Sequence, residues 1–186
     1  MESTDLYDHI EPPEEVELDP VAEADLEPEP DKKLVIFAWS GDLDRLWPTL
    51  ILATTGAAMG MQTTVFFTFW GLFPLVKNEV RITGENWMQK MMSVFNRGGT
   101  DHLKLSKMNF AGAGPAMMKK LAREHKVASP TELLEMARDM GVRLIPCQMT
   151  MDLLGLTRED LIEGLDEPAG ATSALLEAQD ATTLFI

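Results

Sequence analysis

Residues 46–76 contain no charged side chain, and this stretch constrains the fold more than any other feature of the chain. It is long enough to span a bilayer as a helix. Its character changes along its length, however, because residues 46–59 are rich in Leu and Ala, whereas residues 63–69 (TTVFFTF) are β-branched and aromatic. It is also interrupted by Gly56, Gly60, Gln62 and Gly71. We therefore predict a helix and a strand buried in one α/β core, with a membrane-associated segment as the alternative.

Charge divides the chain of 186 residues into two parts. Residues 1–31 hold 13 of the 30 acidic residues and none of the 16 Lys and Arg residues. This segment has few large apolar side chains to offset its ordering entropy, so we predict a disordered acidic tail over 1–31 and an α/β domain over 32–186. The first residues lack the basic start and apolar core of a secretory signal, and we expect a reducing, cytoplasmic setting.

Apolar runs and helix signals alternate along residues 32–186. The expected strands are 34–38, 62–69, 142–145 and 181–186, and the expected helices are 43–59, 86–95, 115–124, 130–140, 157–164 and 171–178. Ser129 with Glu132, and Thr157 with Asp160, have the spacing of capping boxes. This alternation predicts a mostly parallel sheet with helices on both faces, whose strand ends and loops meet at one rim.

Cys147 is the only cysteine, which excludes an intramolecular disulfide and any metal site built from several cysteines. Three scattered histidines give no reason to expect a metal or another cofactor. The thiol follows the strand expected at 142–145, where folds of this class gather their chemistry. The N–H groups of Gln148 and Met149, with a following helix, would favour a nucleophilic thiolate. The alternative is a small buried residue, since free cysteine is commonly buried.

Three glycine-containing loops could bring backbone N–H groups to an anion or a sulfur atom. They contain Gly41, Trp70 with Gly71, and Gly112 with Gly114. The alternative is ordinary turn chemistry, for which glycine is permissive. No phosphate-binding loop motif or GxGxxG is present, so nucleotide binding has weak support.

Residues 97–126 form a basic region in which seven cations face only Asp101 and Glu124. The cations are Arg97, Lys104, Lys107, Lys119, Lys120, Arg123 and Lys126. Such a region is usually a solvent-exposed helix face and loop. The alternative is a docking surface for an acidic partner or for the chain's own tail. We expect no nucleic-acid binding, because residues 32–186 hold 17 acidic against 16 basic residues.

Several segments together resemble the DsrE/DsrF/DsrH-like sulfur-relay family, in particular its DsrE-like subgroup, which often carries the label peroxiredoxin family. The more specific ones are TFWGL at 68–72 and CQMTMDLLGL at 147–156, and the likeness extends over residues 32–186. The resemblance implies a flavodoxin-like three-layer fold with a five-stranded, mostly parallel sheet, and a homo-oligomer. It also implies that Cys147 accepts sulfane sulfur and passes it on, beside rhodanese-like and TusA-like carriers.

The chain departs from this pattern in two ways. Some relatives have a second cysteine, so a two-cysteine redox cycle is excluded here, and the acidic tail lies outside the family pattern. The TxxC pattern of peroxiredoxins is absent, and some relatives are associated with membranes. The leading hypothesis is a sulfur carrier or sulfurtransferase in which Trp70, Gly71, Gly112 and Gly114 line the pocket of Cys147. The competing hypotheses are a binding or scaffold module with an inert cysteine, and a membrane-attached protein.

Overall fold

The computed structural model describes residues 32–80 and 98–186, all of which belong to one unit, Asp31–Ile186. The tail expected over residues 1–31 and the helix expected at 86–95 lie outside the described residues. In the part that is described, the strands are β1 (Lys33–Ala38), β2 (Gln62–Phe67), β3 (Arg143–Pro146) and β4 (Thr182–Phe185).

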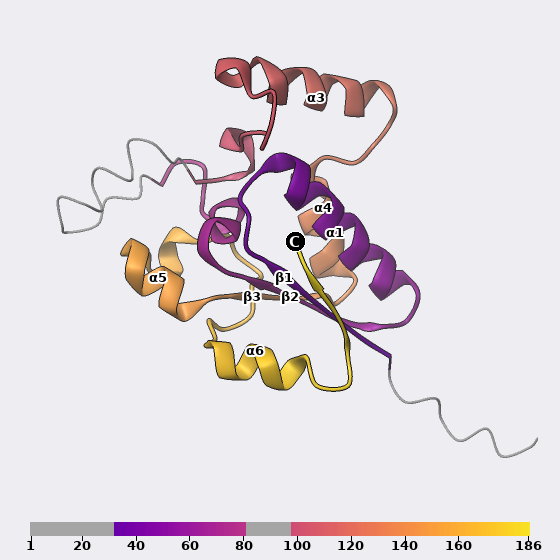
Figure 1. The fold of residues 1–186 in the computed structure, drawn as a ribbon, viewed down its shortest axis with the longest axis vertical. Coiled ribbons are helices and arrows are strands. Elements are labelled where there is room, and N and C mark those ends of the chain that lie inside the picture. Colours follow the sequence, from indigo (N-terminus) through magenta and orange to yellow (C-terminus); the bar gives the residue numbers. More distant parts are fainter. Residues whose placement is uncertain (1–31, 81–97) are drawn as a thin grey trace, which may run out of the picture. The chain divides into compact units, whose positions relative to one another are not determined.

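The four strands form one parallel sheet in the order β3-β2-β1-β4 (Figure 1). β1 lies between two neighbours and is almost wholly buried, as its apolar sequence KLVIFA predicts for a central parallel strand. From β1 to β3 each new strand is added on the same side of the sheet. β4 is then added on the opposite side, where it pairs in parallel with the free edge of β1. The described residues supply four strands, one fewer than the resemblance implied, and the parallel α/β class is confirmed.

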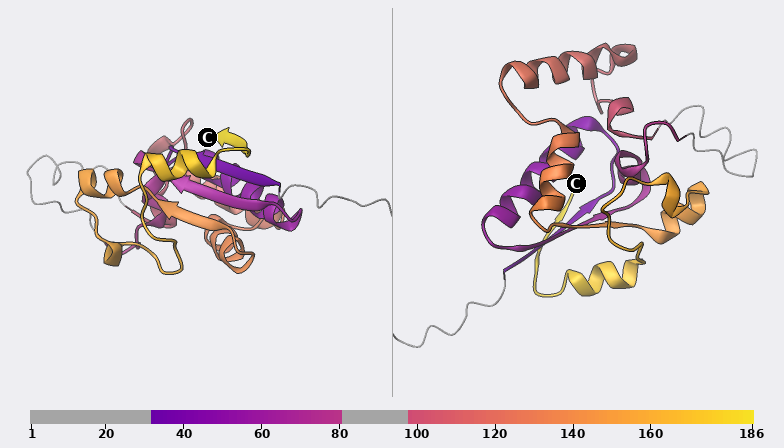
Figure 2. Two further views of the ribbon diagram at one scale, coloured as in Figure 1. Left: turned by 90° about the horizontal axis from the view of Figure 1, so that it is seen from below. Right: turned by 180° about the vertical axis from the view of Figure 1, so that it is seen from behind.

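Helices cover both faces of the sheet, but unequally (Figure 2). On one face, α1 (Leu43–Ala58) and α4 (Pro130–Asp139) pack side by side and bury leucines such as Leu50 and Leu133 against the strands. On the other face lies the short α6 (Ala171–Glu177), which has one buried residue, Ala174. The main core therefore lies on the α1/α4 side.

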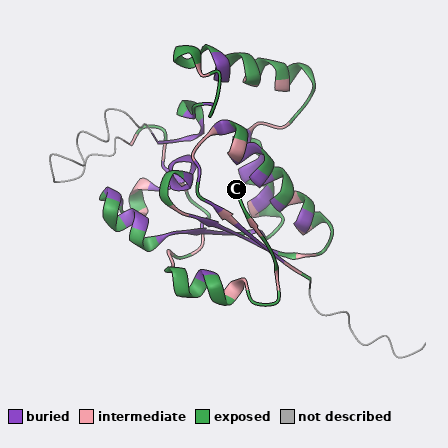
Figure 3. Ribbon diagram, viewed as in Figure 1, coloured by how far each residue is buried: buried purple, intermediate pink, exposed green. Residues whose placement is uncertain are grey.

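Two further helices lie away from the main core. α5 (Gln148–Leu154) follows the carboxyl end of β3, and α3 (Ala113–Glu124) is largely exposed along its length (Figure 3). Single turns or short runs of 3₁₀ helix occur at η1 (Phe69–Leu75), η2 (Thr100–His102), η3 (Phe110–Gly112) and η4 (Arg158–Asp160). These short elements connect the longer ones.

The uncharged segment 46–76 forms most of α1, all of β2 and the η1 helix. Leu46, Val65 and Leu72 are each at most 2% exposed, so the segment belongs to the protein core, as its composition predicts. Within residues 32–80 and 98–186, no helix has the length and apolar character that crossing a membrane requires.

Both capping boxes are present, but three element boundaries differ from expectation. Ser129 and Glu132 cap α4, whereas the box of Thr157 and Asp160 begins only one 3₁₀ turn, not a helix that reaches residue 164. The second strand ends at Phe67 rather than at residue 69, because Phe69 has a φ of 49°, which no strand accommodates. The loop expected after Cys147 is the helix α5.

Candidate functional site

Cys147 lies at the junction between β3 and α5 and is the N-cap residue of that helix. Its N–H donates to the carbonyl of Phe67 at 2.9 Å, and its own carbonyl accepts from the N–H of Met151 at 3.0 Å. Gln, Met and Leu in residues 148–154 are strong helix formers, and Gly155, with a φ of 68°, ends the helix. The thiol therefore stands at the carboxyl end of a parallel strand, as predicted.

The side chain of Cys147 is buried, with 3% of its surface exposed. It belongs to a small cluster with Phe66, Ile145 and Ala174, against which Phe37 and Ala169 also pack. The expectation of a reachable thiol at the rim is wrong for this conformation. The reason is strand alternation, which places Cys147 on the same face as Ile145 and therefore under α6 rather than out into solvent.

Gln148 and Met149 flank the thiol, as their position in the sequence requires. The N–H of Gln148 donates to the carbonyl of Ala169 at 3.0 Å, so this group is already engaged. Its side-chain Nε2 donates to Asp152 at 2.7 Å. Met149 belongs to the first turn of α5, where N–H groups have no acceptor within the helix, and its side chain is 63% exposed.

Trp70 and Gly71 lie beyond β2, next to the end of β1. The N–H of Gly71 is shared between the carbonyls of Trp39 and Thr68, and any Cβ on Gly71 would collide with the carbonyl of Ala38. Glycine is required at this position by close backbone packing. Trp70 lines an open hollow of about 310 Å³ together with Trp39, Arg45 and His102, and Cys147 is not among its lining residues.

Gly112 and Gly114 lie at the start of α3, and neither belongs to the cluster around Cys147. Gly112 is the N-cap of that helix with a φ of 98°, a conformation that favours glycine. Gly114 is packed so closely that a Cβ would collide with the carbonyl of Met108. Turn and packing requirements account for both glycines, and the structure does not join them to the thiol.

Thr150 is a residue of this region that sequence reasoning missed. Its side chain is 2% exposed, and its hydroxyl accepts the N–H of Phe69 at 3.1 Å and lies 3.3 Å from the hydroxyl of Thr68. These contacts tie the loop after β2 to the first turn of α5. A single hydroxyl inside the apolar motif CQMTMDLLGL was the available signal.

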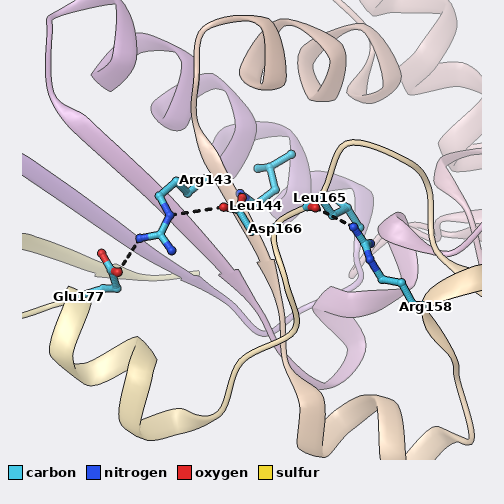
Figure 4. Close-up of polar contacts among 6 residues, drawn as sticks. All are labelled: Arg143, Leu144, Arg158, Leu165, Asp166 and Glu177. Carbon is cyan, nitrogen blue, oxygen red and sulfur yellow. Dashed lines mark hydrogen bonds and ion pairs between the residues drawn. The ribbon is translucent and has the colours of Figure 1, made fainter.

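Arg143 connects β3 to the helix that covers Cys147 (Figure 4). Its guanidinium group donates to Glu177 at the end of α6 at 2.5 Å and lies 3.4 Å from Asp166. The hydrogen bond to Glu177 is the main reason that the pKa of Arg143 lies above its ordinary value. Asp166 also accepts the N–H of Leu144 at 2.8 Å, which fixes the segment before α6 along the edge of β3.

The described part of the basic region lies on α3 and on the segments just before and after it. Lys119 donates to the carbonyl of Thr100 at 3.2 Å, and Lys120 lies 3.8 Å from Glu124 on the same helix. Arg97 lies outside the described residues. Across residues 32–80 and 98–186, no three or more His, Cys, Asp or Glu side chains gather in a way that could hold a metal ion.

Comparison with known proteins gives matches over nearly the whole α/β domain. The model of the DsrE/DsrF/DrsH-like family matches residues 30–186. The chain is 40% identical over 156 residues to the uncharacterized protein YrkE of Bacillus subtilis, covering 83% of this chain and 97% of that one. It is also 40% identical over 145 residues to the sulfur carrier protein DsrE2 of Allochromatium vinosum, covering 76% and 89%.

A solved structure shares the fold. The ychN protein of Escherichia coli superposes with a TM-score of 0.52 at 14% sequence identity, over 83% of this chain and 99% of that one. At this identity the match bears on the fold alone, and it agrees with the parallel sheet with helices on both faces.

Proposed function

The chain belongs to the DsrE/DsrF/DrsH-like family, and from this premise we propose that it is a sulfur-relay protein that carries sulfane sulfur on Cys147. The relative named a sulfur carrier supports the relay role. The observation that carries the residue assignment is that Cys147 is the chain's only cysteine and caps α5 at the carboxyl end of β3. Any sulfur held on a cysteine of this chain is held there.

The proposed reaction is an exchange between persulfides and thiolates. The thiolate of Cys147 attacks the outer sulfur of a donor persulfide; the donor's S–S bond breaks, and the donor leaves as a thiolate. Cys147 then bears Sγ–SH, with the proton of the outer sulfur retained. A thiolate of the acceptor attacks that outer sulfur, and Cys147 leaves as a thiolate. No net oxidation or reduction occurs, so no redox cofactor takes part.

The position of Cys147 supports this role, and its burial sets a condition on it. As the N-cap residue of α5, Cys147 lies beside the backbone N–H groups of the helix's first turn, at the carboxyl end of β3 where folds of this class gather their chemistry. The burial of Cys147 means that the sulfur has to become exposed during each transfer. A thiol that is covered between transfers is protected from other oxidants and thiols, which suits a carrier.

The partners follow from the chemistry of transfer and from the resemblance. With one cysteine, both the donor and the acceptor are other molecules, and we propose rhodanese-like and TusA-like proteins for these roles. A cytoplasmic location and a homo-oligomer remain predictions. Gel filtration with light scattering measures the second directly.

The test is to weigh the intact protein after incubation with a small-molecule persulfide such as glutathione persulfide. We expect the gain of one sulfur atom, its removal by an added acceptor thiol, and no gain in the Cys147→Ser variant. The proposal is wrong if the wild-type protein gains nothing under conditions in which its thiol is shown to be reachable, or if both proteins gain sulfur equally.

A binding or scaffold module with an inert cysteine is the second candidate, and the burial of Cys147 favours it. In that case Cys147→Ser would retain all partner binding. Transfer of labelled sulfur to an acceptor protein separates the two candidates, because only a carrier loses transfer when the cysteine is replaced.

A further inference from the structure

The face of the sheet that bears Cys147 has a thin cover. Among the residues that the structure describes, α6 is the helix on that face (Figures 1 and 2). It contributes Ala174 to the cluster around the thiol. The opposite face is buried under two longer helices, α1 and α4. The seven residues of α6 therefore cover the thiol cluster together with Phe37 and Ala169, which pack beside it.

α6 is held to the sheet by few apolar contacts. Ala174 is its one buried residue, whereas Leu175 and Leu176 are 64% and 60% exposed and add little to its attachment. Its N-cap residue is Gly170, which provides no side-chain cap. A helix of this length is not stable by itself, so its attachment depends on a small number of contacts.

The chain segments on either side of α6 are hydrogen-bonded to the sheet. α6 can therefore move between these two fixed points while the rest of the fold stays in place. Before it, Ala169 donates to the carbonyl of Pro146 at 3.0 Å and accepts from the N–H of Gln148 at 3.0 Å. After it, β4 pairs with β1. Gly170 and Asp180, which has a φ of 56°, lie close to the two points where the chain would bend.

The ion pair between Arg143 and Glu177 fastens the last turn of α6 (Figure 4). Arg143 points to the same face of β3 as Cys147, four residues earlier along the strand. The two side chains are 47% and 36% exposed, so the pair is accessible to solvent and to screening by salt. This contact therefore joins the cover directly to the strand that carries the thiol.

We propose that α6 is a movable cover over the sulfur of Cys147 and that the Arg143–Glu177 ion pair controls how often it opens. Opening exposes the thiol to a donor or acceptor while the sheet and the α1/α4 face stay folded. The purpose of the opening, access for sulfur transfer, rests on the proposed function. Arg143 and Glu177 are positioning residues that act through α6.

The first test measures the rate at which iodoacetamide alkylates Cys147 in the native full-length chain. We expect Glu177→Gln to raise this rate about 2- to 5-fold, the size expected for a solvent-exposed ion pair. A negative charge at the end of a helix is unfavourable, so removing it would by itself stabilise α6. A faster reaction therefore reports the loss of the contact with Arg143.

The matched control is Glu124→Gln, which makes the same substitution in the Lys120–Glu124 pair on α3. We expect it to leave the alkylation rate unchanged. Raising the salt concentration should speed alkylation of the wild type and of Glu124→Gln, but not of Glu177→Gln. Equal rates in all three proteins would overturn the proposal.

A second variant acts in the opposite direction. Gly170 has an extended backbone with a φ of −90°, and a Cβ placed there meets no atom within 4 Å. Gly170→Ser supplies the missing cap hydroxyl, and we expect it to slow alkylation about 2-fold. A rate that does not fall would show that the stability of α6 does not limit access.

Urea distinguishes a local movement from unfolding of the whole domain. Opening of α6 exposes little surface, so alkylation in low urea should depend on urea much less steeply than global unfolding does. The same steepness would contradict the cover. Alkylation needs no sulfur donor, so the two proposals can fail separately. If the cover opens but the protein takes up no sulfur, only the proposed function is wrong. If the protein takes up sulfur but Glu177→Gln has no effect on alkylation, only the cover is wrong.

Discussion

Thr150 joins the ends of two strands through one hydroxyl group. The group receives the N–H of Phe69, whose φ of 49° is unusual for a bulky residue, and lies beside the hydroxyl of Thr68. A backbone N–H that loses its acceptor in a partly buried place is costly. The hydroxyl therefore stabilises a strained turn next to the thiol.

Replacing Thr150 by Val should lower the free energy of unfolding by about 1 to 2 kcal/mol, because the shape is kept and the acceptor for Phe69 is lost. Urea unfolding followed by tryptophan fluorescence measures this. Thr150→Ser keeps the hydroxyl and removes a methyl group, so it should lose less stability than Thr150→Val. The reverse order would show that the methyl group, not the hydrogen bond, matters at this position.

The glycines show how far a residue can be understood from sequence. Gly71 and Gly114 were expected to offer N–H groups to a ligand, yet what each position requires is the absence of a Cβ opposite a carbonyl. That requirement arises between segments distant in sequence, such as Ala38 and Gly71. The sequence contains both residues but does not show that the fold brings the carbonyl of one against the glycine of the other.

The capping box of α4 is an element whose local sequence determines its start. The N–H of Ser129 donates to the carboxylate of Glu132 at 2.7 Å, and the hydroxyl of Ser129 accepts the N–H of Glu132 at 3.3 Å. The hydrogen bond from the backbone of Ser129, and then that from its hydroxyl, lower the pKa of Glu132 below its ordinary value of 4.5. A lowered carboxyl pKa in the folded state stabilises the fold above the ordinary value, and that stability is lost as the pH falls through the folded value.

Ser129→Ala should destabilise the protein by about 1 kcal/mol at neutral pH through loss of the cap. The pKa of Glu132 should rise only part of the way to its ordinary value, because the backbone N–H remains. An NMR titration of the Glu132 carboxyl measures the second effect and urea unfolding the first. Ser129→Thr keeps the hydroxyl and serves as the control. An unchanged pKa in Ser129→Ala would contradict the role of the hydroxyl.

Elements with strong local signals were predictable, and those defined by tertiary contacts were not. α1, α4 and β1 have apolar periodicity, caps or continuous apolar runs, and their positions are confirmed within a few residues. α5 was missed because its seven residues are too few to show a period. Its start depends on Cys147 pairing with Phe67, across eighty residues of sequence.

At the scale of the whole molecule, the two faces of the sheet differ in how firmly they are covered. The α1/α4 face has a large leucine-rich cluster, while the buried cluster on the other face is small and consists of Phe66, Ile145, Cys147 and Ala174. The position of Cys147 at a strand end was predictable from the order of elements. Its burial was not, because α6 reaches it from residues 171–177, and nothing in the motif CQMTMDLLGL indicates a cover supplied from elsewhere.

Charge is also distributed unequally over the whole chain, with consequences for its behaviour in solution. The full chain has a net charge of −14, of which residues 1–31 contribute −13, so residues 32–186 carry 17 acidic against 16 basic residues. A chain that begins at Lys32 is therefore nearly neutral at pH 7, and nearly neutral proteins associate and precipitate more readily. Among residues 32–80 and 98–186, the buried hydrophobic residues all lie at position 34 or later, so the shortened chain retains all of them.

We expect this shortened chain to fold with the same near-ultraviolet circular dichroism and to focus at a clearly higher isoelectric point than the full chain. Its solubility at pH 7 and low salt should fall, and it should recover at pH values well away from the new isoelectric point, where net charge restores repulsion. Circular dichroism, isoelectric focusing and light scattering across pH measure these outcomes. Loss of the folded spectrum would show that the boundary at residue 32 is wrong, whereas unchanged solubility would show that the charge of the first 31 residues is not what keeps the protein in solution.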